Sequence, residues 1–171
     1  VEKPDAGDIV DQERIPIELT DTSLDVFNKV TDAAVCMLSR SWPLLLSGKA
    51  QRIPMDLSKG SYFGGRKPAD GLIDWKKSAV DIYNLIRGVT HPYPGAFTYL
   101  NGSKVFIWKS RSVPGGGGEG HIVSERPLMV GTGDGLLEII SLQIEGEEEL
   151  NAESFTSLYS LAGRRFESFF S

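Results

Sequence analysis

Residues 96–108 read AFTYLNGSKVFIW, and this stretch decides the fold of the second half of the chain. Two apolar, aromatic-rich runs flank Asn101-Gly102, which is the strongest short sequence signal for a two-residue β-hairpin. Further strand-like runs follow at residues 121–124, 127–132 and 136–144. Asp134-Gly135 marks a second tight hairpin. Several short strands within about 50 residues predict a small closed or partly open barrel, because closure removes exposed strand edges.

The first 48 residues predict one strand and one helix. Residues 9–19 read IVDQERIPIEL, and the alternation from Ile15 to Leu19 is typical of a half-buried strand, which Pro16 restricts to a sheet edge. Thr22 and Asp25 have the spacing of a helix capping box. The helix that follows carries an apolar stripe formed by Phe27, Val30, Ala34, Met37 and Leu38.

Three residues of this helix region carry local predictions. Pro43 lacks a backbone N–H, so we expect it to kink or interrupt the helix before the leucines at 44–46, and we expect Gly48 to end it. Cys36 is interpreted as a small buried or half-buried hydrophobic side chain.

A second helix is predicted to begin after Ser78, which has capping-box spacing to Asp81, with Gly88 in the left-handed position after its last turn. Its apolar stripe comprises Ala79, Ile82, Ile86 and Val89. A short helix over residues 151–161 presents Phe155, Leu158 and Tyr159. Residues 49–73 have no sustained period and are rich in glycine and proline, so we interpret them as a linker between a domain portion at 1–48 and a domain at 74–171.

Composition excludes several classes of function. The chain has 171 residues, of which 40% are hydrophobic and 24% charged, as in globular domains. A single cysteine excludes a disulfide within the chain and a cysteine-built zinc or iron–sulfur site, and two histidines leave little for a histidine metal site. The net charge of −5 disfavours a general nucleic-acid binder. The longest uncharged, apolar-rich stretch, residues 41–48, is far shorter than the ~20 residues of a membrane span.

The beginning of the chain suggests location and context. It starts at Val1 without the pattern of a signal peptide, from which we expect a cytoplasmic protein. Residues 1–8 are polar turn material, from which we expect the chain to be a fragment of a longer polypeptide. Asp5-Ala6-Gly7-Asp8 fits either an ordinary Asx-type turn or a turn where the backbone approaches a ligand closely, and its composition alone favours the ordinary turn.

Other candidate motifs favour structural interpretations. The glycine-rich run at residues 114–120 lacks the Gly-Lys-Ser/Thr ending and the helix of a phosphate-binding loop, so we interpret it as a mobile strand connection. The acidic run at residues 145–150 is expected to be a solvated loop. His121 is a lone histidine in a predicted strand beside the glycine-rich run and is expected to be structural.

Three ordered parts of the sequence together resemble the folate-dependent formyltransferases. The first is DAGDIVDQERIPI at residues 5–17. The second comprises GGRKPADGLIDWKKSAVDIYNLIRG at residues 64–88 and THPYPGAFTYLNG at residues 90–102. The third is GTGDGLLEIISLQIEGEEELNAESF at residues 131–155. The similarity extends over about residues 1–167, and the Pro-Gly-Ala-Phe and Gly-Asp-Gly stretches make it specific.

The resemblance implies a fold and a site. The chain would comprise the last strand and helix of a Rossmann-like catalytic domain, a linker, and a C-terminal β-barrel resembling an OB fold. Asp5 would match the family's catalytic aspartate, while Val1, Glu2, Lys3, Pro4 and Asp5 would border the pterin of 10-formyltetrahydrofolate. No metal is implied. The family's asparagine and histidine lie in an upstream segment that does not occur in this sequence, so we expect the isolated chain to be inactive.

Two acceptors compete within this resemblance. One branch formylates a nucleotide-linked amino sugar such as UDP-4-amino-4-deoxy-L-arabinose, and the other formylates methionyl-tRNA. Residues 95–171 contain six basic and ten acidic side chains, and a net acidic surface disfavours tRNA, so we predict the sugar-nucleotide branch. Missing parts of the catalytic domain or another chain would cover the helix at residues 22–48.

A non-enzymatic module that binds nucleic acid or sugar is a weaker alternative. OB-like barrels bind such ligands by aromatic stacking, and the first hairpin carries four aromatic residues. Phe97 and Tyr99 share one face, and Phe106 and Trp108 share another. Core packing is the prediction for most of them, because alternate strand positions must fill a barrel.

Overall fold

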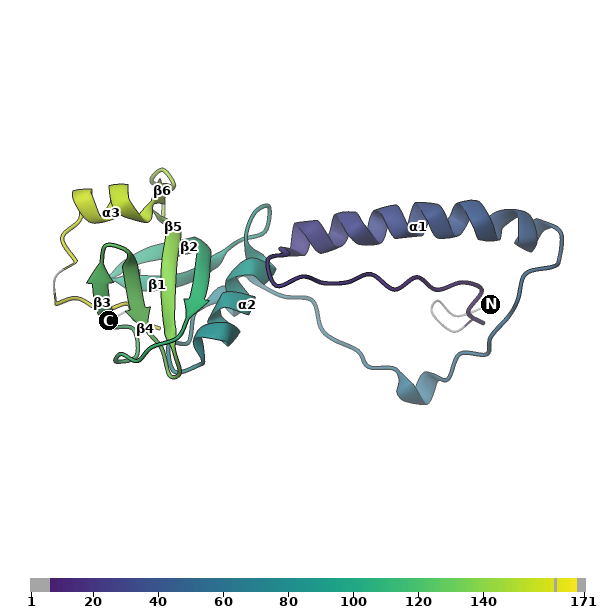
Figure 1. Ribbon diagram of the computed structural model, residues 1–171, viewed down its shortest axis with the longest axis horizontal. Helices are drawn as coiled ribbons and strands as arrows, with labels where there is room; N and C mark the ends of the chain where they lie inside the picture. Colours follow the sequence, from purple (N-terminus) through teal and green to yellow (C-terminus); the bar gives the residue numbers. More distant parts are fainter. Residues whose placement is uncertain (1–6, 162, 169–171) are drawn as a thin grey trace. The chain divides into compact units, whose positions relative to one another are not determined.

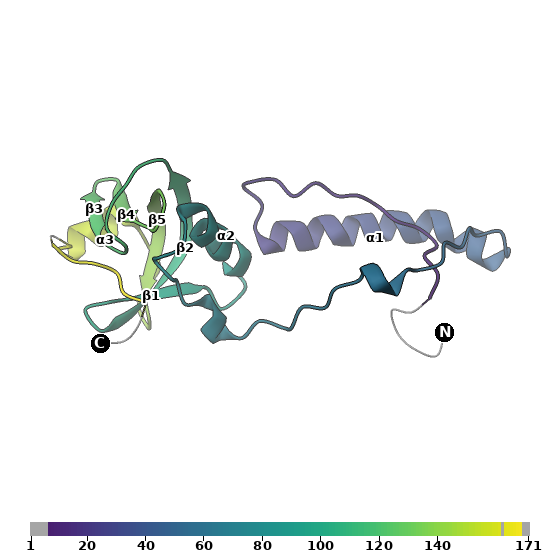
Figure 2. The same cartoon turned by 90° about the horizontal axis from the view of Figure 1, so that it is seen from below.

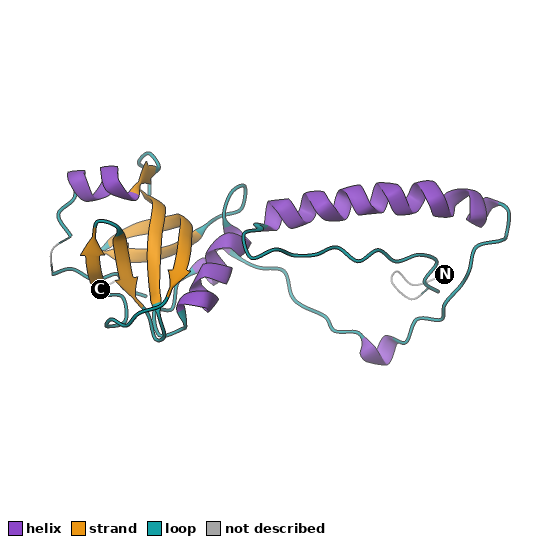
Figure 3. Ribbon diagram, viewed as in Figure 1, coloured by secondary structure: helices purple, strands orange, loops and turns teal. Residues whose placement is uncertain are grey.

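The computed structural model describes residues 7–161 and 163–168. The chain divides into two compact units, residues 1–65 and residues 66–171. Figure 3 shows that the named strands all belong to the second unit. In the described residues, none of the helices combines the length and the apolar character needed to cross a bilayer.

The first unit is built on one long helix, α1 (Ser23–Leu46), coloured purple in Figure 1. Its capping box is confirmed, because the Thr22 side chain accepts from the Asp25 N–H and the Asp25 carboxylate accepts from the Thr22 N–H. The helix is not interrupted at Pro43, contrary to one of the two outcomes expected there. It ends in a Schellman motif around Gly48, whose φ is +68°.

The strand predicted within residues 9–19 does not form. A single antiparallel bridge joins Ile9 to Ile53, and residues 10–18 have no regular secondary structure. Figures 1 and 2 both show this segment running beside α1. A strand needs a neighbouring strand to satisfy its N–H and C=O groups, and the described part of the first unit offers none beyond Ile53.

The apolar stripe of α1 is largely exposed. Phe27 is 59% exposed and Leu38 is 61% exposed, as expected for a helix whose packing partner is not in the described residues. Cys36 is also exposed, so its predicted burial is wrong. With about 3.6 residues per turn, Cys36 lies on the side of α1 opposite that stripe, where no sheet or second α-helix of the described first unit covers it. Two short 3₁₀ turns, Leu57–Lys59 and Pro68–Gly71, interrupt the region predicted as a linker.

The first α-helix of the second unit is α2 (Ala79–Val89), capped by Ser78 as predicted. All four residues of its predicted stripe are buried. Gly88 lies inside the helix rather than after it, because the helix continues to Val89 and the Thr90 N–H still donates to the Ile86 carbonyl.

An antiparallel six-stranded sheet forms the body of this unit. Its strands are β1 (Ala96–Leu100), β2 (Ser103–Val113), β3 (Ile122–Glu125), β4 (Leu128–Gly131), β5 (Leu136–Ile144) and β6 (Leu150–Asn151). Their order is β1-β2-β5-β4-β3, with β6 paired to β5. The predicted hairpin at Asn101-Gly102 is confirmed, with φ values of 52° and 78° at the two turn residues.

A C-terminal segment connects the two edges of the sheet. Among the described residues β1 and β3 do not pair with each other. Instead Tyr99 of β1 exchanges both backbone hydrogen bonds with Glu167, at 2.9 Å each, and the Phe166 N–H donates to the Gly120 carbonyl at 2.8 Å. A Cβ at Gly120 would lie 2.1 Å from the Phe166 carbonyl oxygen, so this approach requires glycine.

The core lies between α2 and one face of the sheet. Its largest fully buried side chains include Ile73, Ile82, Ile86, Ile107, Leu142, Phe155 and Phe166. The short helix α3 (Ala152–Leu158) contributes Phe155 but leaves Leu158 68% exposed, so the predicted stripe of this helix is only partly buried. The unit is therefore a mixed α/β domain with an antiparallel sheet.

A buried polar relay offers a test of this core. The Trp75 indole N–H donates to the Thr98 hydroxyl at 2.9 Å, and that hydroxyl donates to the Glu167 carbonyl at 2.8 Å. Thr98→Val leaves the buried Trp75 indole N–H without an acceptor, while the Glu167 carbonyl keeps its bond from the Tyr99 N–H, and it is expected to lower the free energy of unfolding by about 1–3 kcal/mol. Thr98→Ser keeps the hydroxyl and is the matched control in urea unfolding. A valine variant as stable as the wild type would contradict the role of the relay.

Candidate functional site

The predicted catalytic and folate-contacting residues lie outside the described part of the chain. These are Val1, Glu2, Lys3, Pro4 and Asp5, and their roles stay predictions. The structure does describe the segment that follows them in the sequence. The site built here is therefore the anchor that fixes residues 9–13 to the rest of the first unit.

The first contact of the anchor is a pair of backbone hydrogen bonds. The Ile9 N–H donates to the Ile53 carbonyl at 2.8 Å, and the Ile53 N–H donates to the Ile9 carbonyl at 2.9 Å. This reciprocal pair fixes the direction of the backbone at Ile9, four residues beyond Asp5. The pairing partner comes from the chain after α1, so sequence periodicity could not reveal it.

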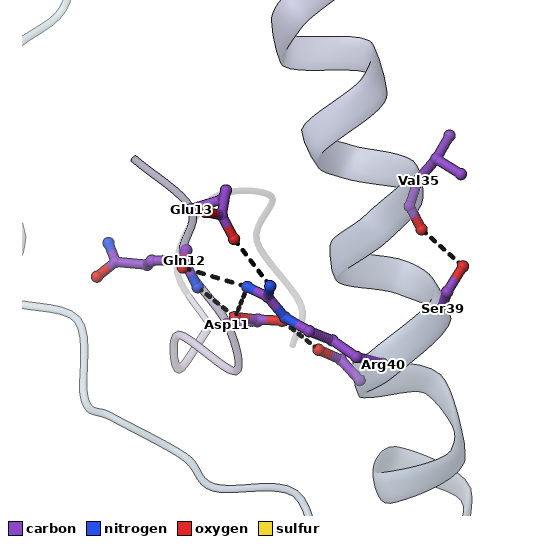
Figure 4. A network of polar contacts seen from close by, with 7 residues as sticks. Asp11, Gln12, Glu13, Val35, Ser39 and Arg40 are labelled. Atoms are coloured by element: carbon purple, nitrogen blue, oxygen red, sulfur yellow. Dashed lines mark hydrogen bonds and ion pairs between the residues drawn. The ribbon is translucent and has the colours of Figure 1, made fainter. Parts of the chain in front are cut away.

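Arg40 of α1 makes the second contact, shown in Figure 4. Its Nε donates to Asp11 Oδ2 at 2.7 Å and its Nη2 to Asp11 Oδ1 at 2.8 Å, which is the bidentate arrangement that guanidinium and carboxylate groups favour. Its Nη1 lies 2.8 Å from Glu13 Oε2. One guanidinium therefore binds two carboxylates of the same extended segment.

Two further donors complete the binding of Asp11. The Ser41 hydroxyl donates to Oδ2 at 2.5 Å, and the Gln12 N–H donates to Oδ1 at 2.8 Å. The neighbouring Ser39 hydroxyl turns back to the Val35 carbonyl and takes no part in this network (Figure 4). We call Asp11, Glu13, Arg40 and Ser41 the Arg40 clamp.

The clamp has a clear electrostatic signature. Hydrogen bonds from Arg40 and then from Ser41 hold the pKa of Asp11 well below its usual range. The carboxylates of Asp11 and then Glu13 raise the pKa of Arg40 further. Both groups are consequently charged at every physiological pH, and the clamp does not switch with pH in that range.

A second polar contact holds the same segment nearer the start of α1. Lys29 Nζ donates to Asp21 Oδ2 at 2.6 Å and to the Pro16 carbonyl at 3.3 Å. Between the two contacts lies an open cleft of about 610 Å³, and most of its wall is aliphatic. Its lining includes Val10, Ile15, Val30, Ala34, Met37 and Leu38. Apart from members of the Arg40 clamp, these side chains carry no acid, base or nucleophile.

The second unit carries an aromatic row that sequence reasoning placed wrongly. The register pairs Phe97 with Phe106, so the aromatic residues of β1 and β2 share one face of the sheet. Phe97 and Trp108 are buried, as core packing predicts, but all four lie outside the main core cluster of the described residues. Phe106 stacks on Trp108 with ring centroids 5.4 Å apart, and Trp108 stacks on His91 at 3.8 Å.

Charged groups cover this aromatic row. Lys104 Nζ lies 4.6 Å from the ring centroids of both Phe97 and Phe106 and 2.9 Å from Glu145 Oε1. His91 Nε2 lies 2.9 Å from Glu149 Oε2. Burial raises the pKa of Glu149, but hydrogen bonds from Ser141 and His91 outweigh it and leave that pKa below its usual value.

The acidic run is an exposed loop over residues 145–149, as predicted, but its carboxylates make specific contacts that were not predicted. Besides the contacts of Glu145 and Glu149, the Tyr159 hydroxyl donates to Glu147 at 2.6 Å, and this carboxylate raises the pKa of Tyr159. The partners lie far away in sequence, so no local pattern could indicate them. Within residues 7–161 and 163–168, no group of three or more His, Cys, Asp or Glu side chains is arranged to hold a metal ion.

Comparison with known proteins identifies both sequence and fold relatives. Residues 66–160 match the family model described as formyl transferase, C-terminal domain. The fold resembles that of HypX from Aquifex aeolicus solved in complex with tetrahydrofolic acid, with a TM-score of 0.68 and 16% identity over 95% of this chain. Two variants of HypX match with TM-scores of 0.65 and 0.63 at 18% and 19% identity. This chain spans about 29–30% of the length of those structures.

The Arg40 clamp predicts an unusual titration of Asp11. Because its folded pKa lies below its unfolded value, the clamp's contribution is complete above the unfolded pKa of about 3.9 and is lost only as pH falls through the folded pKa. In carboxyl-carbon NMR, Asp11 should stay ionised over the range of about pH 3–5 in which ordinary aspartates titrate. Arg40→Gln should raise its midpoint, whereas Lys29→Ala should leave it unchanged. An ordinary midpoint in the wild type would contradict the clamp geometry.

Proposed function

Since this chain belongs to the formyl transferase family through its C-terminal domain, residues 66–160, we propose that it is part of a folate-dependent formyltransferase. The reaction transfers the formyl group of 10-formyltetrahydrofolate to the amine of a nucleotide-linked amino sugar, such as UDP-4-amino-4-deoxy-L-arabinose. The family match carries the formyl-transfer part of this proposal, and the choice of acceptor rests on charge. The fold likeness to HypX, which was solved with tetrahydrofolic acid, supports folate as the cosubstrate.

The proposed chemistry assigns a role to Asp5. The acceptor amine attacks the formyl carbon and forms a tetrahedral oxyanion, which the family's asparagine and histidine stabilise. The amine must lose a proton before the folate leaves. A carboxylate at Asp5 would orient the histidine, increase its basicity and help to accept this proton. Residues Val1 to Pro4 would contact the pterin mainly through backbone groups.

Charge within residues 95–171 favours a small acceptor over tRNA. Three of the six basic residues between positions 95 and 171 are paired with carboxylates in the structure. The pairs are Lys104–Glu145 at 2.9 Å, Arg111–Glu138 at 2.6 Å and Arg165–Glu167 at 3.6 Å. A domain that holds tRNA gains affinity by neutralising phosphates, and cations already paired with carboxylates contribute less to this. Methionyl-tRNA is therefore the second candidate acceptor.

The aromatic row gives little support to a nucleic-acid or sugar binding module. Stacking on bases or sugars needs accessible ring faces. Lys104 lies over Phe97 and Phe106, and His91 lies over Trp108. Phe97 and Trp108 are each only 9% exposed. The row is a satellite cluster that orders the residues around it rather than an open platform.

The acceptor can be tested directly. We expect the enzyme that carries this chain together with the family's asparagine and histidine to formylate UDP-4-amino-4-deoxy-L-arabinose in the presence of 10-formyltetrahydrofolate. We expect much slower transfer to methionyl-tRNA at physiological salt. The 171-residue chain alone should transfer no formyl group to either acceptor. Preference for methionyl-tRNA would select the second candidate, and transfer by the chain alone would contradict the assignment of the active site.

The role of Asp5 can be tested in the same enzyme. Asp5→Asn removes the carboxylate while keeping the size of the side chain, and turnover should fall by about 10²–10⁴-fold. The melting temperature should stay near that of the wild type, since the change removes one acceptor charge and no packing. Asp8→Asn, three positions along, is the matched control and should retain activity. Near-normal turnover of the Asp5 variant would remove this residue from the mechanism.

A further inference from the structure

We propose that Arg40 is a positioning residue for formyl transfer, because it fixes the segment that directly follows Asp5. This inference rests on the proposed function for its kinetic consequence. Its structural basis is the Arg40 clamp itself, in which one guanidinium donates to Asp11 at 2.7 and 2.8 Å and lies 2.8 Å from Glu13. Arg40 acts on the reaction through the backbone and is distant in sequence from the catalytic motif.

The clamp constrains a short length of chain next to the motif. Asp11 lies six residues beyond Asp5 and Ile9 lies four residues beyond it. A fully extended chain covers about 3.3–3.6 Å per residue, so four residues of chain measured from an anchor at Ile9 can span at most about 14 Å. The reciprocal pair between Ile9 and Ile53 supplies that anchor, and the clamp holds the backbone two residues further on.

Geometry, rather than stability, is the expected benefit of this clamp. Its members are partly open to solvent, with the side chain of Arg40 50% exposed and that of Asp11 20% exposed. Ion pairs in such settings contribute little to stability. Bidentate geometry and the additional Ser41 donor nevertheless define a single orientation for the backbone of residues 11–13. Small displacements of a catalytic group can cost about 10²-fold in rate.

Lys29 provides a matched control on the same helix and the same segment. It also joins α1 to the extended segment through one carboxylate and one carbonyl, at 2.6 and 3.3 Å. Its contacts are to Asp21 and Pro16, eleven or more residues beyond Asp5. Removing Lys29 deletes an ion pair of similar exposure without releasing the residues next to the motif.

The test compares Arg40→Ala, Arg40→Lys and Lys29→Ala in the enzyme that carries the catalytic asparagine and histidine. We expect Arg40→Ala to lower kcat by about 10–100-fold, with KM for the sugar nucleotide changed by less than about threefold. Arg40→Lys should restore part of the loss, and Lys29→Ala should stay within about threefold of the wild type. An unchanged kcat for Arg40→Ala, or an equal loss for Lys29→Ala, would overturn the proposal.

A second readout separates this proposal from the proposed function. In the 171-residue chain, amide hydrogen exchange at Ile9 and Gln12 reports the anchor, because these N–H groups donate to Ile53 and to Asp11. Exchange at both should accelerate in Arg40→Ala and not in Lys29→Ala, and unaltered exchange in Arg40→Ala would overturn the clamp's ordering role. A wild-type enzyme that formylates neither acceptor would refute the proposed function. Hydrogen exchange would still test whether the Arg40 clamp orders residues 9–13, because that measurement does not depend on activity.

Discussion

Packing of the α2 stripe against the inner face of the antiparallel sheet is the interaction on which the second unit depends. Ile82 and Ile86 are each 1% exposed, and Ile107 and Leu142 on the sheet are fully buried. Burying one such side chain contributes about 1.5–3 kcal/mol to the stability of the fold. A few of these side chains together therefore contribute more than any single polar contact in the unit. The first unit has no comparable core, since the stripe of α1 is exposed within the described residues. Its extended segment is instead oriented by the Arg40 clamp and by the Lys29–Asp21 ion pair.

These two modes of stabilisation suit different tasks. A packed core gives a unit of fixed shape, whereas an ion pair with good geometry fixes the direction of a single stretch of backbone at little gain in stability. The segment that follows the proposed catalytic aspartate is held in the second way, by Arg40 and by the pairing of Ile9 with Ile53. Precision next to a reacting group matters more for rate than the free energy that the contact adds.

Local patterns predicted much of the fold but little of the site. The caps at Thr22 and Ser78, the buried stripe of α2 and the turn at Asn101-Gly102 are confirmed, because short-range rules govern caps, amphipathic helices and hairpins. The strand predicted within residues 9–19 does not form, because a strand needs a neighbouring strand and the sequence of the segment itself does not specify one. The Arg40 clamp joins residues 29 positions apart, and nothing in the spacing of charges reveals such a pair.

The acidic run at residues 145–150 disfavours tRNA in two ways, through its charge and through its contacts with the residues that cover the aromatic row. Counted as charge alone, it makes residues 95–171 net acidic and therefore a poor surface for tRNA. In the structure Glu145 also keeps Lys104 over Phe97 and Phe106, and Glu149 holds His91 against Trp108. The same carboxylates therefore hold Lys104 and His91 in place, and these two side chains cover ring faces that a nucleic-acid surface would use. Both effects reduce the affinity of this surface for a polyanion, which is consistent with the small acceptor proposed above.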